Sequence, residues 1–277
     1  MLKLQITSIE PTTEENIEIL AALFSSFDVD GIEILEHGLA VFLSDELFTT
    51  GEFKSALEEW QSIQPFTYDW EELPNINWNK EWESHFDPVF VEDFLTIKAD
   101  FHEIEPNTKY TITINPKMSF GTGHHATTWM MSKVMEQLNF KDKKVLDAGS
   151  GTGVLAILAK VLGANDIVAF DNDPWCYENA LENVQINDAS TIQLIEGSLE
   201  AVKDEDFDII LANINRNFIV EHGHELIHKL NTDGLLVISG FLNQDVKLIL
   251  DYFHKLNMVA QYLLTKDNWS CVILKKW

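Results

Sequence analysis

The stretch from Val145 to Gly153, VLDAGSGTG, decides how the larger part of this 277-residue chain folds. An apolar run that leads into closely spaced glycines and then into a helical pattern, here from Val154, is typical of a strand, a tight turn and a helix. The turn needs glycines because the chain reverses sharply and a ligand must approach its backbone with no Cβ in the way. The spacing DxGxGxG puts valine where the dinucleotide-binding pattern GxGxxG has its last glycine, so a dinucleotide site is not predicted.

Helical and extended patterns alternate along the chain from about Ser119 onward. Strands are expected at 143–149, 166–171, 191–197, 207–214, 234–240, 259–265 and 270–276, and helices at 154–162, 174–187, 218–230 and 243–256. Such alternation predicts an α/β domain built on a parallel sheet with helices on both faces, here ending in an antiparallel hairpin.

Residues 1–73 follow a different order of patterns, which is strand, helix, two strands, helix and strand. That order predicts a small two-layer α+β domain of ferredoxin-like type. Residues 74–91 are rich in Asn, Trp and acidic side chains and lack periodicity, so they are expected to link this domain to a second one at 92–277. Within the linker, Trp78 and Trp82 are four residues apart and are expected to pack the two domains together from one helical face.

The composition excludes several classes of protein. There are 45 acidic side chains against 19 basic ones, and the net charge is −26. Such a charge disfavours nucleic acids and anionic membranes as ligands and favours a basic partner, although solubility alone also explains an acidic surface. The two cysteines lie far apart, and neither a signal peptide nor a membrane-length apolar run is evident, so a cytoplasmic protein is expected.

Polar side chains stand at the carboxyl ends of two expected strands. Asp171 follows the second strand about twenty residues after the glycine turn, where a carboxylate can accept both hydrogen bonds of a ribose diol. Asp173, directly before a proline, is expected to cap the next helix. Asn213 closes the fourth strand at the edge where such sheets bind ligands, and Arg216 is expected to cap the helix that follows, although it could also orient a carboxylate.

A second glycine-rich segment, residues 118–128, reads MSFGTGHHATT and precedes the first strand of the parallel sheet. Its threonines fall at the start of an expected helix, where free backbone N–H groups suit a carboxylate. Together with NKEWESHF at 79–86, DAGSGTGVLAI at 147–157 and FDNDP at 170–174, this segment closely resembles the ribosomal protein L11 methyltransferase (PrmA) family. The resemblance extends over nearly the whole chain, and the glycine turn is similar to that of Rossmann-like methyltransferases that use S-adenosylmethionine.

The resemblance implies an S-adenosylmethionine-dependent enzyme that methylates lysine side chains and the N-terminal amine of ribosomal protein L11, a basic protein of the large ribosomal subunit. The acidic N-terminal domain is then expected to recognise that substrate. Asn213 is the expected catalytic residue, and it would orient the lone pair of an amine that loses its proton to solvent. The expected cofactor-binding residues are Phe120, Gly121, Thr128, Gly149, Gly151, Asp171 and Asn213.

Two alternatives stay open at this point. The same cofactor site could serve a methyltransferase that acts on another protein or on a small-molecule amine. The segment His224-Glu225-Leu226-Ile227-His228 is a literal HExxH, a pattern typical of zinc peptidases, but no third ligand is marked downstream. We therefore expect no metal site, and the sequence does not predict the oligomeric state.

Overall fold

The computed structural model describes residues 2–7, 9–72, 86–117 and 119–276, and it divides into two compact units, Met1–His85 and Phe86–Trp277. The expected linker 74–91 falls largely outside the described residues, as do Trp78, Trp82 and most of the segment NKEWESHF. Its last residues belong to the second unit, where Val89–Val91 forms strand β5.

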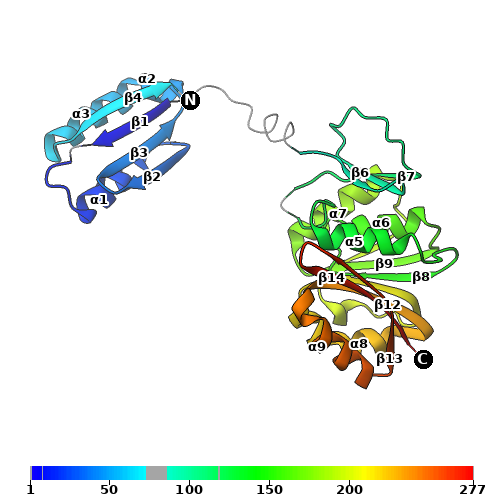
Figure 1. Ribbon diagram of the computed structural model, residues 1–277. Helices are drawn as coiled ribbons and strands as arrows, with labels where there is room; N and C mark the ends of the chain where they lie inside the picture. Colours follow the sequence, from blue (N-terminus) through cyan, green and yellow to red (C-terminus); the bar gives the residue numbers. More distant parts are fainter. Residues whose placement is uncertain (1, 8, 73–85, 118, 277) are drawn as a thin grey trace. The chain divides into compact units, whose positions relative to one another are not determined.

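The first unit is a four-stranded sheet with helices packed on one face (Figure 1). The strand order is β2-β3-β1-β4, and all neighbouring pairs are antiparallel. Its elements are β1 (Leu2–Thr7), α1 (Glu14–Phe24), β2 (Gly31–Leu35), β3 (Gly38–Leu43), α2 (Asp45–Thr49), α3 (Gly51–Ile63) and β4 (Thr67–Glu72). This order and these connections are those of a ferredoxin-like domain, as predicted.

The core of the first unit follows from the alternation of side chains along β1. Leu4 and Ile6 are fully buried on the helical side, whereas Gln5 between them is exposed. Phe24 of α1 meets Trp60 of α3 edge to face, with ring centroids 4.9 Å apart, so both helices contribute to the same core.

The second unit contains a seven-stranded sheet in the order β10-β9-β8-β11-β12-β14-β13. The five strands from β10 to β12 pair in parallel, and β14 pairs antiparallel with both of its neighbours. The elements are α5 (Ala126–Met135), β8 (Lys144–Ala148), α6 (Val154–Val161), β9 (Asp166–Asp171), α7 (Pro174–Ile186), β10 (Gln193–Glu196), β11 (Phe207–Asn213), α8 (Arg216–Lys229), β12 (Leu230–Leu242), α9 (Val246–Lys255), β13 (Met258–Lys266) and β14 (Trp269–Lys276). The predicted Rossmann-like fold is confirmed, and the strand order reverses between β8 and β11.

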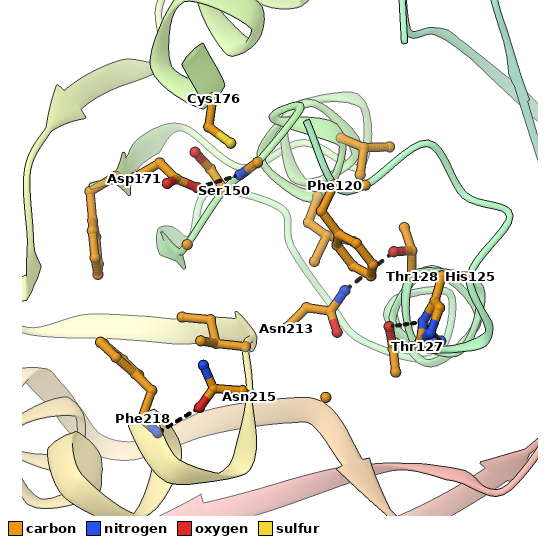
Figure 2. A pocket seen from close by; sticks show the side chains of 18 of the residues that line it. Phe120, His125, Thr127, Thr128, Ser150, Asp171, Cys176, Asn213, Asn215 and Phe218 are labelled. Atoms are coloured by element: carbon orange, nitrogen blue, oxygen red, sulfur yellow. Dashed lines mark hydrogen bonds between the residues drawn. The ribbon is translucent and has the colours of Figure 1, made fainter. Parts of the chain in front are cut away.

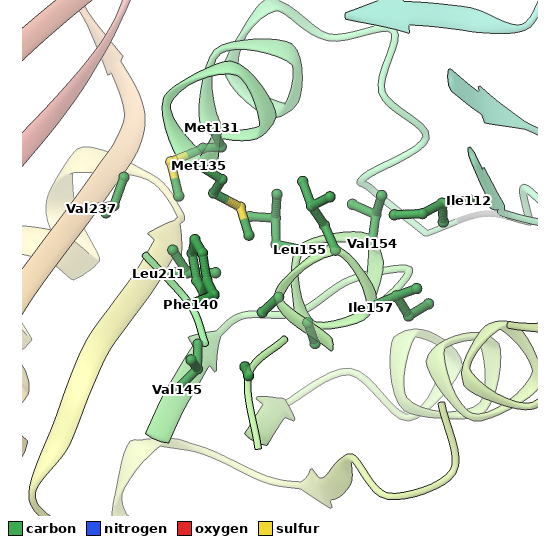
Figure 3. Packing of buried hydrophobic residues seen from close by; sticks show 14 of the residues in the cluster. Ile112, Met131, Met135, Phe140, Val145, Val154, Leu155, Ile157, Leu211 and Val237 are labelled. Atoms are coloured by element: carbon green, nitrogen blue, oxygen red, sulfur yellow. The ribbon is translucent and has the colours of Figure 1, made fainter. Parts of the chain in front are cut away.

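Both faces of this sheet are buried because its strands carry apolar side chains at successive positions. One face, with Val145 and Leu211, packs against α5 and α6 (Figure 3). The other face, with Leu146 and Ile210, packs against α8 and α9. Phe140, which is 1% exposed, precedes β8 and fills the first of these two cores.

A small sheet and two short 3-10 turns complete the second unit. The small sheet joins β5 to β6 (Leu95–Lys98) and β7 (Tyr110–Thr113), in that order. The 3-10 turns are η1 (Leu199–Ala201), which follows β10, and η2 (Asn243–Asp245), which occupies the expected start of α9. No helix among the described residues is long and apolar enough to span a membrane.

Candidate active site

A pocket of about 450 Å³ opens at the carboxyl ends of β8, β9 and β11, next to the point where the strand order reverses (Figure 2). All the residues predicted to bind the cofactor line this pocket, and they are Phe120, Gly121, Thr128, Gly149, Gly151, Asp171 and Asn213. They come from two glycine-rich turns, one helix start and two strand ends.

The glycines of the turn after β8 are required by close approach as well as by backbone conformation. Gly149 and Gly151 have φ values of 68° and 52°, in the left-handed region that favours glycine. A Cβ on Gly151 would lie 2.2 Å from the carbonyl oxygen of Phe120, and one on Gly149 would lie 2.7 Å from Cδ1 of Ile214. Neither position therefore tolerates a larger residue without a shift of the pocket wall.

The two glycine-rich segments are held together by hydrogen bonds from Thr152. Its backbone N–H donates to the carbonyl oxygen of Phe120 at 2.9 Å, and its Oγ1 donates to the carbonyl oxygen of Gly121 at 2.8 Å. Because Thr152 is fully buried, these bonds are shielded from water. They hold the Phe120 backbone at the pocket, where its side chain is half exposed.

Asp171 closes one side of the pocket and is held by the backbone. Its Oδ2 accepts the N–H of Gly151 at 2.8 Å, and its Oδ1 accepts the N–H of Asp173 at 3.0 Å. Each oxygen keeps a lone pair for a ligand. Asp173 caps α7 as predicted, because its side chain accepts the N–H of Trp175 at 2.9 Å.

Asn213 lies on the opposite side of the pocket and points its amide nitrogen at α5. Nδ2 donates to Oγ1 of Thr128 at 3.2 Å (Figure 2). The amide oxygen, Oδ1, is buried and has no hydrogen-bond partner among the described residues. A buried acceptor without a partner costs about 1 to 3 kcal/mol, so this oxygen fits a site that is completed by a donor from a ligand.

Asp147, the first acidic residue of the DxGxGxG spacing, lies beneath the pocket and does not line it. Its Oδ2 accepts the N–H of Ala156 at 3.0 Å, which ties β8 to α6, and its Oδ1 has no partner among the described residues. Burial raises the pKa of this carboxyl to about 7, and the nearby charge of Asp171 adds to the increase.

Several further residues line the pocket that the sequence did not single out for it. Ser198 comes just after β10, so the same rule of strand ends could have found it. His125 caps α5 and meets the ring of Trp269 with centroids 4.8 Å apart. Trp269 and Gly240 come from the last strands of the sheet, and no local pattern marks them. Burial raises the pKa of the Cys176 thiol, so this cysteine favours its neutral form.

The HExxH residues and Arg216 lie on α8 but do not line the pocket. Arg216 occupies the first residue of the helix, and Asn215 is the capping residue instead, since its side chain accepts the N–H of Phe218 at 3.1 Å. The Arg216 guanidinium pairs with Asp245 at 2.9 Å. The prediction that it caps the helix is therefore wrong, because the short Asn215 side chain supplies the acceptor that helix N–H groups need.

Known proteins are similar to this chain over most of its length. A family model described as ribosomal protein L11 methyltransferase (PrmA) matches residues 12–277. A protein named ribosomal protein L11 methyltransferase from Porphyromonas gingivalis is 32% identical over 272 residues, which cover 95% of this chain and 92% of the relative. A relative of the same name from Chlorobaculum tepidum is 35% identical over 269 residues, with 93% and 92% covered.

A solved structure agrees with this relationship. The crystal structure of a ribosomal protein L11 methylase from Lactobacillus delbrueckii subsp. bulgaricus is similar over 69% of this chain and all of its own, with a TM-score of 0.65 and 27% identity. The resemblance that the sequence motifs suggested is thereby confirmed, and the chain belongs to the ribosomal protein L11 methyltransferase (PrmA) family.

Proposed function

We propose that this protein transfers methyl groups from S-adenosylmethionine to amines of ribosomal protein L11, on lysine side chains and at the N-terminus. The single observation that carries the proposal is the Asn213 amide at the end of β11. Its nitrogen is fixed by Thr128 and its buried oxygen is free, so the pocket offers one oriented acceptor for an N–H group. The family to which the chain belongs agrees with this chemistry.

The described residues fit the proposed cofactor. A pocket of about 450 Å³ lies within the range of small-molecule and cofactor sites. Gly149 and Gly151 let a ligand approach the backbone where any Cβ would intrude, and the remaining lone pairs of Asp171 suit a ribose diol. When bound, S-adenosylmethionine supplies an electrophilic methyl group on a sulfonium sulfur.

The protein's contribution is then mainly orientation and exclusion of water. Asn213 would accept an N–H of the incoming amine through Oδ1 and so direct the nitrogen lone pair, and Thr128 would stop the amide from turning. Both residues belong to a buried wall, since Thr128 is fully buried and Asn213 is partly buried. If the Asn213 oxygen were displaced, the amine could rotate so that its lone pair no longer faces the methyl group.

No strong base faces the amine among the described residues that line the pocket. Asp171 carries their one carboxylate, and both of its oxygens already accept backbone N–H groups. Nδ1 of His125 accepts the N–H of Thr127 at 3.3 Å, so this ring nitrogen is already engaged by the start of α5. We therefore infer that the ammonium group loses its proton to solvent before it enters the pocket.

We further propose that the first unit recognises the substrate. Its residues 1–72 carry sixteen Asp and Glu side chains against two lysines, a field that would attract a basic ribosomal protein. Its core is separate from the two cores of the second unit, so recognition and chemistry can reside in different parts of the chain. A linker around 74–91 would let one pocket reach several amines.

The first test is intact-mass spectrometry of unmethylated L11 after incubation with this protein and S-adenosylmethionine. Mass gains in steps of about fourteen daltons, one per methyl group, are expected, and peptide mapping would place them on lysine and N-terminal amines. No gain, with cofactor binding still measured by calorimetry, would overturn the choice of L11 and move the acceptor to another protein or a small-molecule amine.

A further inference from the structure

Three side chains that can bind a metal meet on the second unit outside the pocket. They are Glu200 in η1 and His222 and Glu225 in α8, and one ligand atom of each lies within 4.8 Å of the others. The two histidines of the HExxH segment, His224 and His228, do not belong to this group.

The spacing between the two helical residues suits a shared ion. His222 and Glu225 are three residues apart and so lie on one face of α8. Nδ1 of His222 is 3.6 Å from Oε2 of Glu225, too far for a hydrogen bond. Two ligands that each lie about 2.1 Å from a tetrahedral zinc ion are about 3.4 Å apart, which is close to the observed separation.

The nitrogen of this pair lacks any other partner. Nδ1 of His222 is inaccessible to solvent and accepts or donates no hydrogen bond among the described residues. The ring itself is held against Phe218, with centroids 4.3 Å apart, so it cannot easily turn that nitrogen toward water. A buried nitrogen that has no hydrogen-bond partner and lies 3.6 Å from a carboxylate oxygen is a donor atom in need of a cation or a proton.

The charge of the cluster favours a cation. Within the described residues, no lysine or arginine forms an ion pair with the carboxylate of Glu200 or Glu225, and the nearby Lys203 ammonium donates to the backbone carbonyl of Glu200 at 2.8 Å. Both carboxylates line a surface cavity of about 490 Å³, which gives an ion access from solvent. Glu200 is exposed on a short turn, and a change of rotamer can bring it closer to the other two groups.

We propose that Glu200, His222 and Glu225 form a binding site for a divalent first-row transition cation, with Zn²⁺ as the probe that fits best. One imidazole nitrogen with two carboxylates suits Zn²⁺ or Mn²⁺, whereas Mg²⁺ prefers oxygen ligands and water. The site replaces the expectation of no metal, and it uses the glutamate of the HExxH segment with a histidine that lies outside that segment.

The bound ion would join η1 to α8, two segments that also reach the pocket. Ser198 lines the pocket and donates a hydrogen bond to Glu200, and Phe218 lines it and packs on His222. A cation bound by both Glu200 and His222 would therefore stabilise the part of the pocket wall that Ser198 and Phe218 form. Its role is structural support of that wall, and it takes no part in methyl transfer.

Calorimetric titration of the full-length, untagged and EDTA-treated protein with ZnCl₂ tests this proposal. One equivalent should bind, and Glu200→Gln, His222→Gln and Glu225→Gln should each weaken binding at least tenfold. The matched controls His224→Gln and His228→Gln, on the same helix, should keep the parental affinity. Zn²⁺ should also raise the melting temperature of the parent and of both controls, but not that of the three ligand variants.

Three results would overturn the site. They are an absence of saturable binding, parental affinity in all three ligand variants, and loss of binding in the His224 or His228 controls, which would assign the metal to the HExxH pair instead. Circular dichroism of each variant without Zn²⁺ checks that it folds. If Glu225→Gln does not fold, Glu200→Gln in the exposed turn decides the question. None of these results depends on methyl transfer, so the proposed function is tested separately.

Discussion

Thr128, in the first turn of α5, accepts a hydrogen bond at 3.2 Å from Nδ2 of Asn213, which closes β11 and lies 85 positions further along the chain. This bond decides which end of the Asn213 amide faces the pocket. Because Thr128 takes the nitrogen, the buried oxygen remains for a ligand. The orientation of the Asn213 amide oxygen therefore depends on both the start of α5 and the end of β11.

Replacing either partner should reduce turnover for different reasons. Asn213→Ala removes the acceptor, and we expect kcat to fall about a hundredfold, with a smaller loss of cofactor affinity. Thr128→Val keeps the size of the side chain but leaves Nδ2 without its partner, so kcat should fall about tenfold. Steady-state kinetics with L11, together with calorimetry of S-adenosylmethionine binding, measures both effects.

The double variant with both substitutions provides the control for this pair. If Thr128 acts only through Asn213, the double variant should be no slower than Asn213→Ala alone. Full turnover and full cofactor affinity in Asn213→Ala would show that the proposed role of this residue is wrong.

Gly151→Ala should abolish cofactor binding while the protein stays folded. The new Cβ would lie 2.2 Å from the Phe120 carbonyl oxygen, which Thr152 holds in place, so the two glycine-rich segments would be forced apart. We expect cofactor affinity to fall at least a hundredfold in a calorimetric titration. Gly51→Ala, whose Cβ meets nothing within 4 Å, is the matched control and should bind as the parent does. Equal affinity in the two variants would contradict the role assigned to this turn.

The buried Asp147 predicts how stability depends on pH. Its pKa rises from 3.8 to about 7 on folding, so the native state binds more protons than the unfolded chain between about pH 4 and pH 7. The free energy of unfolding should therefore fall as pH rises through that window, by up to about 1.4 kcal/mol per pH unit from this group. Above pH 7 the contribution becomes constant.

Asp147→Asn isolates this contribution because it keeps the shape of the side chain and cannot ionise. Urea unfolding of parent and variant between pH 4.5 and 8 should show the parent losing stability relative to the variant as pH rises. The other titrating groups are common to both proteins and cancel in the difference. Parallel stability curves would mean that Asp147 has an ordinary pKa in the folded protein.

The fold was predictable to a large extent because its signals are local. Continuous apolar runs such as DIVAFD mark strands buried on both faces, and the glycines after β8 mark the turn that builds the pocket. Asp171 and Asn213, which end strands, and Thr128, which lies at a helix start, were found for the same reason, whereas Ser198 just after β10 was not. Trp269 and Gly240 could not be found in this way, because the antiparallel pairing of β12 with β14 brings them to the pocket.

The metal-binding cluster illustrates the opposite case. HExxH is a short local pattern that can arise by chance, and it contains no information about η1, whose Glu200 lies next to His222 and Glu225. The prediction that Arg216 caps the start of α8 was also wrong, since the Asn215 side chain accepts the N–H of Phe218. A contact between segments that are distant in sequence decides the first feature, whereas the cap at Asn215 is a local contact that follows the ordinary preference for asparagine at this position.

Removing residues 1–73 should separate substrate recognition from cofactor binding. Among the described residues, the two cores of the second unit and the pocket are built from Val89 onward, so the shortened chain keeps them. It loses a unit whose described strands and helices carry a strong negative charge, and with it the proposed attraction for a basic protein. We expect calorimetry to give an unchanged affinity for S-adenosylmethionine, whereas kcat/KM for L11 falls at least a hundredfold.

Raising the salt concentration should lower the activity of the full chain toward L11 and leave cofactor binding unaffected, because screening weakens only the attraction between the two proteins. Undiminished methylation of L11 by the shortened chain would place recognition of the substrate in the second unit.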